Sequence, residues 1–509
     1  MPPEKNIQAI KTFDQYPAVI QELPADLETP VSVYLKLAGT EPSFLLESIS
    51  GGENLARYSF IGVQPRGAFI LRNGEMEICM DGQTRFQAID TSKPLDCLRQ
   101  HLANPENVVQ PAGLPRFHGG LVGYLGYEMM RFFEKNVPLE PYTDLPDAIF
   151  LLADTLVAFD HAFGKILLIV RYRTAEDVGT AHQEALKRLK DLRKRLDGPI
   201  PMQRYVPSVM HQQELSSNMT RTQYHSAVER AKEHITAGDA FQIVLSQRLS
   251  RGTEAEAFSI YRALRSLNPS PYMFFFNFGK LAGEPGLQLI GASPELHVRL
   301  EKGQAAVRPI AGTRPRSAQP LEDLALEQEL LADPKERAEH VMLVDLARND
   351  LGRVCEYGSV DVPEQMVVER YSHVMHIVSE VTGRLKSELD AFDLMQATFP
   401  AGTVSGAPKI RAMQIIDQLE KDPRGVYAGA VGYFAMDGSM DTCIAIRTMV
   451  MRGKQISVQA GAGIVADSDP EKEYQESLNK ARALAVAVEM AETNAVFSRP
   501  LQGENGGAA

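Results

Sequence analysis

The strongest constraint on the fold comes from two helical stretches that each begin with Asp-Pro. In the first, Asp333 and Pro334 predict a helix start, because Asp caps a helix and Pro has no N–H to lose in the first turn. Glu336 and Glu339 then share a helical face with Leu343, which we expect to turn inward. Carboxylates that face an interior need a cation or protons. Alternatively, Glu336 completes a capping box with Asp333.

The second stretch repeats this arrangement more than 100 residues later. Asp469 and Pro470 predict another helix start, and Glu473 and Glu476 have the same three-residue spacing. Two inward Glu-x-x-Glu pairs could hold one hard divalent cation, with Mg²⁺ keeping some of its water. The simpler alternative is that Glu476 pairs with Lys480, four residues further on.

Composition restricts the class of protein. The chain has 509 residues, 44% of them apolar and 23% charged, as in ordinary globular proteins. A net charge of −12 without a long Lys/Arg block argues against a nucleic-acid or anionic-membrane partner. No apolar run is long enough to span a bilayer, and no signal peptide is evident. The four cysteines lack metal spacing, so we expect a soluble cytoplasmic protein: Cys79, Cys97, Cys355 and Cys443.

Short strand patterns alternate irregularly with helices along the whole chain, which indicates an α+β fold. A polar, proline-bearing passage at 197–219 predicts a boundary between an N-terminal region, 1–205, and a second region, 206–495. We expect residues 496–509 to be a disordered tail. In the second region, single strands are predicted for AAVRPIAG and for DTCIAIRTMVM.

Two side chains on predicted strands are candidates for chemistry. Strand alternation places His376 on an apolar face, where it is either a hydrogen-bonded core residue or a proton carrier near neutral pH. Arg447 is expected on the same strand face as Cys443 and Ala445. These small neighbours leave room for a carboxylate held by two hydrogen bonds, and an internal salt bridge is the alternative.

Glycine-rich segments add two further candidates. Gly461, Ala462 and Gly463 end a predicted strand, where consecutive N–H groups could form an anion-binding nest. The segment also fits the dinucleotide pattern G-x-G-x-x-A, but the next helix begins only at Pro470, outside that pattern, which argues against it. A flexible loop before another helix presents the hydroxyl of Thr403.

Several of these segments resemble, in sequence and in order, the chorismate-utilising enzymes. The resemblance covers about 215–490 and rests on GASPELHV, RPIAGTRPR, LVDLARNDLGRV, YSHVMHIVS, FPAGTVSGAPKIRAM and QAGAGIVADSDPEKEYQE. It implies an α+β fold of two large antiparallel sheets packed across each other, with helices outside. It also implies an active site that binds chorismate and Mg²⁺.

Single positions favour the anthranilate-forming branch of this family. Gln242 stands where the isochorismate- and salicylate-forming members carry a lysine base, and Ala311 stands where aminodeoxychorismate-forming members carry a lysine. LLESISGGENLARYSFIG and NPSPYMFFF resemble the tryptophan-feedback site of the anthranilate branch. The alternatives are an enzyme that forms aminodeoxyisochorismate or aminodeoxychorismate, and a non-catalytic tryptophan sensor.

The resemblance implies a role for each matching residue in converting chorismate and ammonia to anthranilate and pyruvate. The catalytic residues would be His376, Thr403, Glu295 and Gln242. The substrate would be bound by Gly312, Thr313, Tyr427, Arg447, Gly461, Ala462 and Gly463. Magnesium would be held by Glu339, Glu476, Glu336 and Glu473. The tryptophan effector site would comprise Glu47, Ser48, Arg57, Pro271, Tyr272, Met273, Val431 and Tyr433.

The source of ammonia is a further expectation. A glutaminase needs an activated cysteine, commonly in a G-x-C-x-G turn with a histidine base. None of the four cysteines lies in such a turn. We therefore expect a separate glutamine amidotransferase subunit, in a heterotetramer of two large and two small subunits.

Overall fold

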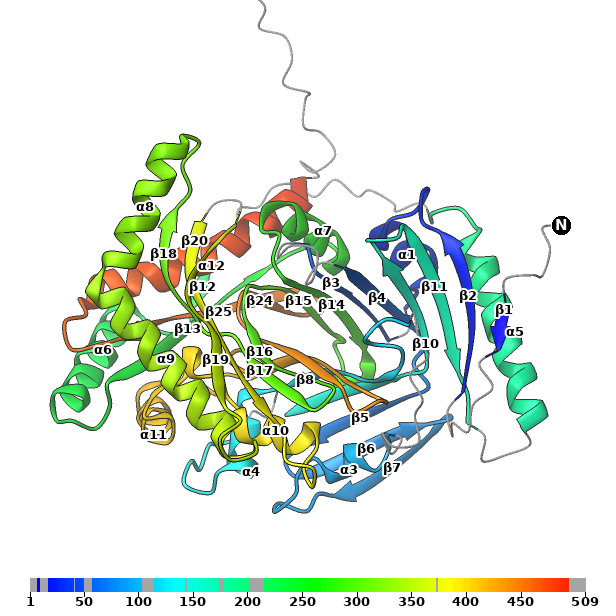
Figure 1. Cartoon of the computed structure of the whole chain (residues 1–509), viewed down its shortest axis with the longest axis horizontal. Helices are drawn as coiled ribbons and strands as arrows, with labels where there is room; N and C mark the ends of the chain where they lie inside the picture. Colours follow the sequence, from blue (N-terminus) through cyan, green and yellow to red (C-terminus); the bar gives the residue numbers. More distant parts are fainter. Residues whose placement is uncertain are drawn as a thin grey trace, which may run out of the picture.

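Two large antiparallel sheets form the centre of the computed structural model, and helices cover their outer faces (Figure 1). The structure describes residues 7–9, 17–40, 42–49, 57–102, 114–141, 144–173, 178–201, 215–371 and 374–493. This architecture confirms the fold predicted from the resemblance. No helix among these residues is both long and apolar enough to cross a bilayer.

In the described part of the chain the first sheet has 13 strands, with β21 beside β13 near one end. In spatial order they are β1 (Ile7–Ala9), β2 (Ala18–Pro24), β11 (Lys165–Arg171), β10 (Thr155–Asp160), β4 (Tyr58–Val63), β3 (Ser43–Glu47), β14 (Tyr272–Gly279), β15 (Leu287–Ser293), β24 (Thr448–Arg452), β25 (Gln455–Ile464), β13 (Gln242–Gly252) and β12 (Ser216–Ser217), with β21 (Gly406–Ala407).

The second sheet has 12 strands among the residues that the structure describes, with β19 beside β20. In spatial order they are β18 (Ile310–Pro315), β20 (Val374–Arg384), β17 (Gln304–Val307), β16 (Leu296–Glu301), β23 (Met440–Ile444), β22 (Ala430–Ala435), β8 (Gly120–Leu125), β9 (Ala148–Ala153), β5 (Gly67–Arg72), β6 (Glu75–Met80) and β7 (Gln83–Ala88), with β19 (Asp361–Arg370).

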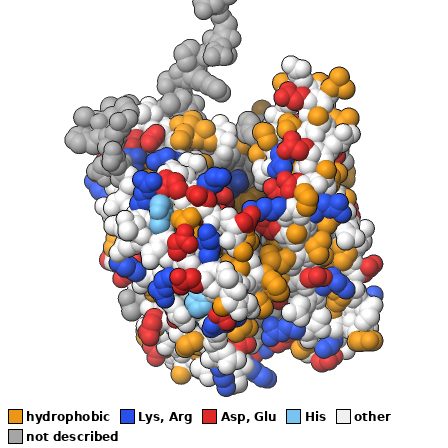
Figure 2. All heavy atoms as spheres, turned by 90° about the vertical axis from the view of Figure 1, so that its left-hand side faces the viewer, with side chains coloured by type: hydrophobic (Ala, Val, Ile, Leu, Met, Phe, Trp, Pro, Cys, Tyr) orange, Lys and Arg blue, Asp and Glu red, His pale blue; other side chains and the backbone are white. Residues whose placement is uncertain are grey.

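Helices connect and flank these strands (Figure 1). They are α1 (Pro30–Leu37), α3 (Asp96–Arg99), α4 (Met130–Phe133), α5 (Val178–Leu196), α6 (Arg221–Thr236), α7 (Ala257–Leu267), α8 (Pro320–Ala332), α9 (Pro334–Gly352), α10 (Ala391–Thr398), α11 (Lys409–Leu419) and α12 (Pro470–Thr493), with the 3-10 turns η2 (Tyr127–Met129), η3 (Lys280–Ala282) and η4 (Gly402–Val404). Helix α8 stands out on the left of Figure 1, and Figure 2, which faces that side, shows side chains of both charges mixed over this face of the molecule.

The sequence of β14 explains how the layers pack. Successive side chains of a strand point to opposite faces. Phe274, Phe276 and Phe278 accordingly join a core that also contains residues of the second sheet, so they lie between the two sheets. Met273 and Phe275 join a different core, which contains residues of α1, α5, α7 and α12. An aromatic strand buried on both faces therefore binds the two sheets and a helical layer together.

Strands from both predicted regions take part in both sheets. β1 to β11 precede the predicted boundary and β12 to β25 follow it, and each sheet contains strands of both sets. Residues 202–214 of the boundary passage and the expected tail, 496–509, lie outside the described residues. The division at 205/206 stays a prediction.

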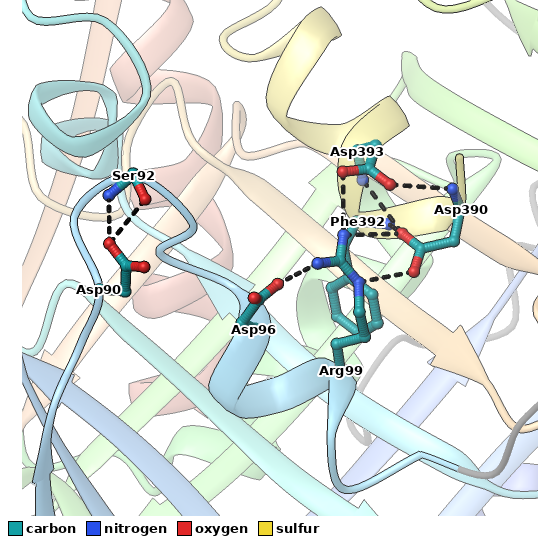
Figure 3. A network of polar contacts seen from close by, with 7 residues as sticks. All are labelled: Asp90, Ser92, Asp96, Arg99, Asp390, Phe392 and Asp393. Atoms are coloured by element: carbon teal, nitrogen blue, oxygen red, sulfur yellow. Dashed lines mark hydrogen bonds and ion pairs between the residues drawn. The ribbon is translucent and has the colours of Figure 1, made fainter. Parts of the chain in front are cut away.

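A charged cluster joins the helical layer across the two regions (Figure 3). Arg99 on α3 donates to Asp390 at 2.6 Å and to Asp393 at 2.9 Å, and it also pairs with Asp96. Asp390 in turn caps α10 by accepting the N–H groups of Phe392 and Asp393. One arginine therefore links α3 to the start of a helix almost 300 residues later.

Two strand predictions were wrong. DTCIAIRTMVM forms β23 in the second sheet and β24 in the first, separated by an irregular crossing at 445–447. The crossing is held by backbone hydrogen bonds from Ala445 to Gly429 and from Ala428 to Ala445. AAVRPIAG forms β17 and β18 with a break at Arg308–Pro309, because proline has no N–H to donate to a ladder.

We predict that Gly123→Ala severely destabilises the fold. Gly123 lies on β8, and a Cβ there would come within 1.8 Å of the carbonyl oxygen of Ile149 on the next strand. Because the obstacle is backbone, relief requires the strands to separate, and we expect a loss of about 3 kcal/mol or more in the free energy of unfolding. Gly39→Ala is the matched control, since no atom lies within 4 Å of its added Cβ. Denaturant unfolding of both variants checks this, and equal stability would contradict it.

Candidate active site

One cavity, here called the central cavity, collects most of the residues that the sequence predicts to be functional. It has about 1170 Å³ of empty space, its mouth included. Twelve predicted residues line it, from strands of both sheets, from α9 and α12, from η4 and from three connections between elements: Gln242, Glu295, Gly312, Thr313, Glu339, His376, Thr403, Tyr427, Arg447, Gly461, Gly463 and Glu476.

A buried carboxyl group lies on one wall of the central cavity. Glu295 follows β15 and is 4% exposed, and its Oε1 accepts a hydrogen bond of 2.6 Å from the Thr403 hydroxyl. Burial raises the pKa of Glu295 to about 8, although hydrogen bonds from Thr403 and from the backbone of Ile310 act in the opposite direction. Glu295 is therefore mostly protonated at neutral pH and suited to act as a general acid.

A neutral imidazole lies on another wall. His376 on β20 donates from Nδ1 to the carbonyl oxygen of Gly312 at 2.9 Å, so its Nε2 carries the lone pair. Burial, reinforced by the charge of Arg447, lowers the pKa of His376. Gly312 has φ +69° at a register shift between β18 and β20. This bulge turns Gly312 and Thr313 towards the cavity.

An arginine enters the cavity where the chain crosses between the sheets. Arg447 has φ +48°, and its carbonyl oxygen accepts the N–H of Ala292. Its guanidinium makes no ion pair with any residue that the structure describes, and the side chain is exposed in the cavity. The alternative of an internal salt bridge is therefore not realised in the described residues, and the fork of donors is available for a planar anion.

The glycine segment on β25 differs from the predicted nest. Val244 and Ser246 on β13 donate their N–H groups away from β25, so Gly463 and Gly461 opposite them form non-hydrogen-bonded pairs. Both glycines consequently direct their own N–H groups away from β13, towards the other edge of β25. On that edge the pairing with β24 stops at Val458, so no strand that the structure describes accepts these two N–H groups. Ala462 pairs with β13 and packs into a core instead. The prediction of three consecutive N–H groups was wrong, and alternate ones face the cavity.

Both glycines are required by close contacts. A Cβ at Gly463 would lie 2.6 Å from Nε2 of Gln242, and a Cβ at Gly461 would lie 2.4 Å from the carbonyl oxygen of Leu245. A Cβ at Gly461 would also lie 3.0 Å from the hydroxyl oxygen of Tyr427. Burial raises the pKa of Tyr427 to about 12. Tyr427 is therefore a neutral hydrogen-bond donor in this wall.

The two predicted Glu-x-x-Glu helices both reach the central cavity. Asp333 caps α9 and Asp469 accepts the N–H of Lys472 at the start of α12, which confirms both helix starts. Glu339 and Glu476 line the cavity, where Gln242 Nε2 donates to Glu339 at 3.0 Å. The alternative pair is also present, since Lys480 donates to Glu476 at 2.7 Å.

The other two glutamates lie beside the cavity lining. Glu336 pairs with Arg314, and its side chain forms no capping box. Burial and the nearby charge of Glu339 raise the pKa of Glu336. In the same way, burial and then the charge of Glu476 raise the pKa of Glu473. Each helix therefore presents two carboxylates whose mutual repulsion a cation would relieve.

No three His, Cys, Asp or Glu side chains within the described ranges are grouped closely enough to hold a metal ion. The donor set nevertheless fits a hard cation, because all four candidates are carboxylates and Mg²⁺ uses few protein ligands and several waters. Burial and then a neighbouring carboxylate raise the pKa values of Glu336 and Glu473, and a nearby cation would stabilise the charged form of both groups.

A second cavity, here called the effector cavity, collects most of the predicted effector residues. It has about 610 Å³ of empty space between β3, β14 and the strands β22 and β23 of the second sheet. The predicted residues that line it are Glu47, Ser48, Pro271, Tyr272, Met273, Val431 and Tyr433. Arg57 is not among its described lining residues, and its guanidinium binds Asp160 at 2.9 Å. The buried Ser48 hydroxyl has no partner in the described part of the chain.

Sequence reasoning missed two polar residues of the central cavity. Lys480 lines it and donates to Gly461 O as well as to Glu476, and Gln459 lies two residues before Gly461 on the same strand face. Gln459 could have been found from the sequence, because residues two apart on a strand share a face and Gln459 lies two residues before Gly461. The four-residue spacing from Glu476 to Lys480 indicated the bond between these two side chains but not that Lys480 lines the cavity.

Comparison with known proteins identifies the family of the chain. A family model described as chorismate binding enzyme matches residues 41–486. The chain belongs to this family of chorismate-binding enzymes.

The relatives place it more narrowly. It is 48% identical to anthranilate synthase component 1 of Pseudomonas aeruginosa, over 94% of this chain and 96% of the relative. Its identity to anthranilate synthase component 1 of Synechocystis is also 48%, over 92% and 95% of the two chains. The solved anthranilate synthase component I of Streptococcus pneumoniae superposes with a TM-score of 0.73 at 38% identity, covering 91% and 98%. The menaquinone-specific isochorismate synthase of Escherichia coli shares the fold, with a TM-score of 0.68 at 21% identity, covering 95% and 96%.

We predict that Glu295 stays protonated at neutral pH and titrates near pH 8. An infrared difference spectrum between the parent and Glu295→Gln would then show the C=O band of a protonated carboxyl at pH 6.5 that disappears as the pH rises through about 8. Thr403→Val removes a donor that lowers the pKa, so the band should persist to higher pH. A parent band that has already disappeared by pH 6 as the pH rises would contradict this prediction.

Proposed function

We propose that this chain is the large subunit of an anthranilate synthase, which converts chorismate and ammonia to anthranilate and pyruvate. The observation that carries the proposal is that a single cavity contains a protonated carboxyl, a neutral imidazole and an arginine with no ion pair in the described residues. These are the acid, the base and the carboxylate-binding group that the reaction requires. The names of the relatives support the same reaction.

The substrate's two carboxylates fit two ends of the central cavity. Arg447, Tyr427 and the N–H groups of Gly461 and Gly463 bind the side-chain carboxylate, because they supply a cation and several donors. Gly312 and Thr313 line the part that receives the ring, since their bulge exposes backbone there. The ring carboxylate then points to Glu339 and Glu476.

In the first step, ammonia adds to the ring and the ring hydroxyl leaves. Glu295 donates its proton to the departing oxygen, so that water leaves rather than hydroxide. Thr403 holds the carboxyl in place through its 2.6 Å hydrogen bond. The added nitrogen then releases a proton, which restores Glu295. Ammonia is already a nucleophile, so no basic residue is needed at the position of Gln242. The amide of Gln242 instead orients Glu339 through a hydrogen bond.

In the second step, the ring becomes aromatic as pyruvate leaves. Nε2 of His376 takes a proton from the substrate ring. It can do so because Nδ1 of His376 donates to Gly312 O and the imidazole is neutral at pH 7. Electrons of the broken C–H bond enter the ring and those of the C–O bond leave on the oxygen of the pyruvate enolate. That enolate then gains a proton at its methylene carbon to become pyruvate.

We propose that Mg²⁺ binds between α9 and α12. Glu339 and Glu476 would bind the ion and Glu336 and Glu473 its waters, with Lys480 and Arg314 releasing their present partners. Bound there, Mg²⁺ supplies positive charge to the ring carboxylate and orients it.

Tryptophan inhibition and a partner subunit complete the proposal. The effector cavity is apolar apart from a few polar groups, among them the Ser48 hydroxyl, which has no hydrogen-bond partner among the described residues. Such a cavity suits an aromatic amino acid. The relatives' designation as component 1 supports a second component. We propose a glutamine amidotransferase that supplies ammonia, in a cytoplasmic heterotetramer of two large and two small subunits.

The test is incubation with chorismate, ammonia and Mg²⁺, following anthranilate fluorescence and pyruvate separately. The parent should form both products in equal amounts, less of each with tryptophan, and neither without Mg²⁺. Glutamine alone should give none. His376→Met removes the base of the second step, so it should consume chorismate while anthranilate formation falls about 100-fold or more.

Other outcomes identify the alternatives. An amino product without pyruvate from the parent would indicate an aminodeoxyisochorismate- or aminodeoxychorismate-forming enzyme. Tryptophan binding without chorismate turnover would indicate a sensor. Full-rate anthranilate release by a folded His376→Met variant would remove the histidine from the second step.

A further inference from the structure

A third cavity, here called the side cavity, lies against the central one. It has about 900 Å³ of empty space, its mouth included, and Tyr427 and Gln459 line both cavities. Along β25, Gln455, Ser457 and Gln459 face the side cavity and Gly461 faces the central one. These residues span about 20 Å at the rise of a strand. Gln455 is exposed, Ser457 is half-buried and Gln459 is 8% exposed, so the strand runs from the surface to the active site.

Gln459 has a buried acceptor without a partner. Its Nε2 donates to Ser246 Oγ at 2.9 Å, while Ser246 Oγ must donate its proton to the Glu420 carboxylate. This fixes the orientation of the amide, because Ser246 can only accept from the NH₂ side. The opposite atom, Gln459 Oε1, is fully buried and has no hydrogen-bond partner in the described residues. A buried carbonyl of this kind is stabilised by a small hydrogen-bond donor.

The charges around the side cavity select a neutral donor. Arg248, Arg424 and Arg452 line it together with one acidic residue, Asp144, so the charged residues of the lining are mostly positive. A cation such as ammonium is therefore disfavoured and gives up its proton more readily. Arg424 donates to Glu420 and to backbone carbonyls, Arg248 pairs with Asp422, and Arg452 donates to three backbone carbonyls. Their donors are thus already engaged by protein acceptors, which leaves little for an anion to bind.

We propose that the side cavity is the entry site for ammonia in its neutral form, with Gln459 Oε1 accepting an N–H before ammonia passes Tyr427 into the central cavity. The proposal rests on the proposed function, since it assigns the second substrate its own subsite. Ammonia then arrives from the Gly461 side, whereas chorismate occupies the central cavity. Neutral ammonia is also the form that can attack the ring.

The test is steady-state kinetics with ammonium chloride at fixed pH and ionic strength. Gln459→Met keeps the length of the side chain and removes the acceptor. It should raise the KM for ammonia about tenfold, as expected for one lost hydrogen bond, with the KM for chorismate nearly unchanged. Ser457→Phe narrows the cavity further out and should also raise the KM for ammonia. Lys454→Phe is the matched control. It adds the same aromatic ring in the turn between β24 and β25, and residue 454 lines neither cavity.

Two results would overturn the proposal. One is that folded Gln459→Met and Ser457→Phe both leave the KM for ammonia within twofold of the parent, which would mean that the cavity holds only water. The other is an equal rise in the KM for chorismate, which would mean a general distortion of the active site. Failure of the proposed function is distinguishable from both, because the parent itself would then form no anthranilate.

Discussion

The crossing of the chain between the two sheets at 445–447 is the constraint on which the site depends. β23 ends in the second sheet and β24 begins in the first, so the intervening residues cannot follow a ladder. Arg447 therefore adopts a left-handed backbone, and β24 ends its pairing with β25 before Gly461. The same departure that brings a guanidinium into the cavity also exposes the alternate N–H groups of Gly461 and Gly463. Cation and donors thus come from one topological feature.

Burial then gives the remaining groups their chemical character. Glu295 is a protonated acid because the packed sheets exclude water from it, and His376 is neutral for the same reason. The glutamates of α9 and α12 are more accessible and repel one another in pairs, which suits them to a cation. A single cavity therefore contains proton donors, proton acceptors and carboxylates whose states differ only through their surroundings.

Much of this could be predicted from the sequence, for identifiable reasons. The Asp-Pro helix starts and the Glu-x-x-Glu spacing are local signals, so α9 and α12 were predicted closely. The break after Ile444 was not predicted. The alternation of inward and outward side chains continues through DTCIAIRTMV, and nothing local shows that the chain changes from one sheet to the other. Strands β9 and β10 were missed because both faces are buried and their apolar runs lack alternation. The expected nest at Gly461 failed because strand pairing, a long-range property, decides where each N–H points.

The most direct test of this account is the affinity for chorismate with Mg²⁺ present and ammonia absent, measured by calorimetry for the parent and Arg447→Gln. If Arg447 holds the side-chain carboxylate through two charged hydrogen bonds, the substitution should weaken binding about 100-fold, and Arg447→Lys should lie in between. A folded Arg447→Gln variant that binds chorismate within twofold of the parent would contradict the account.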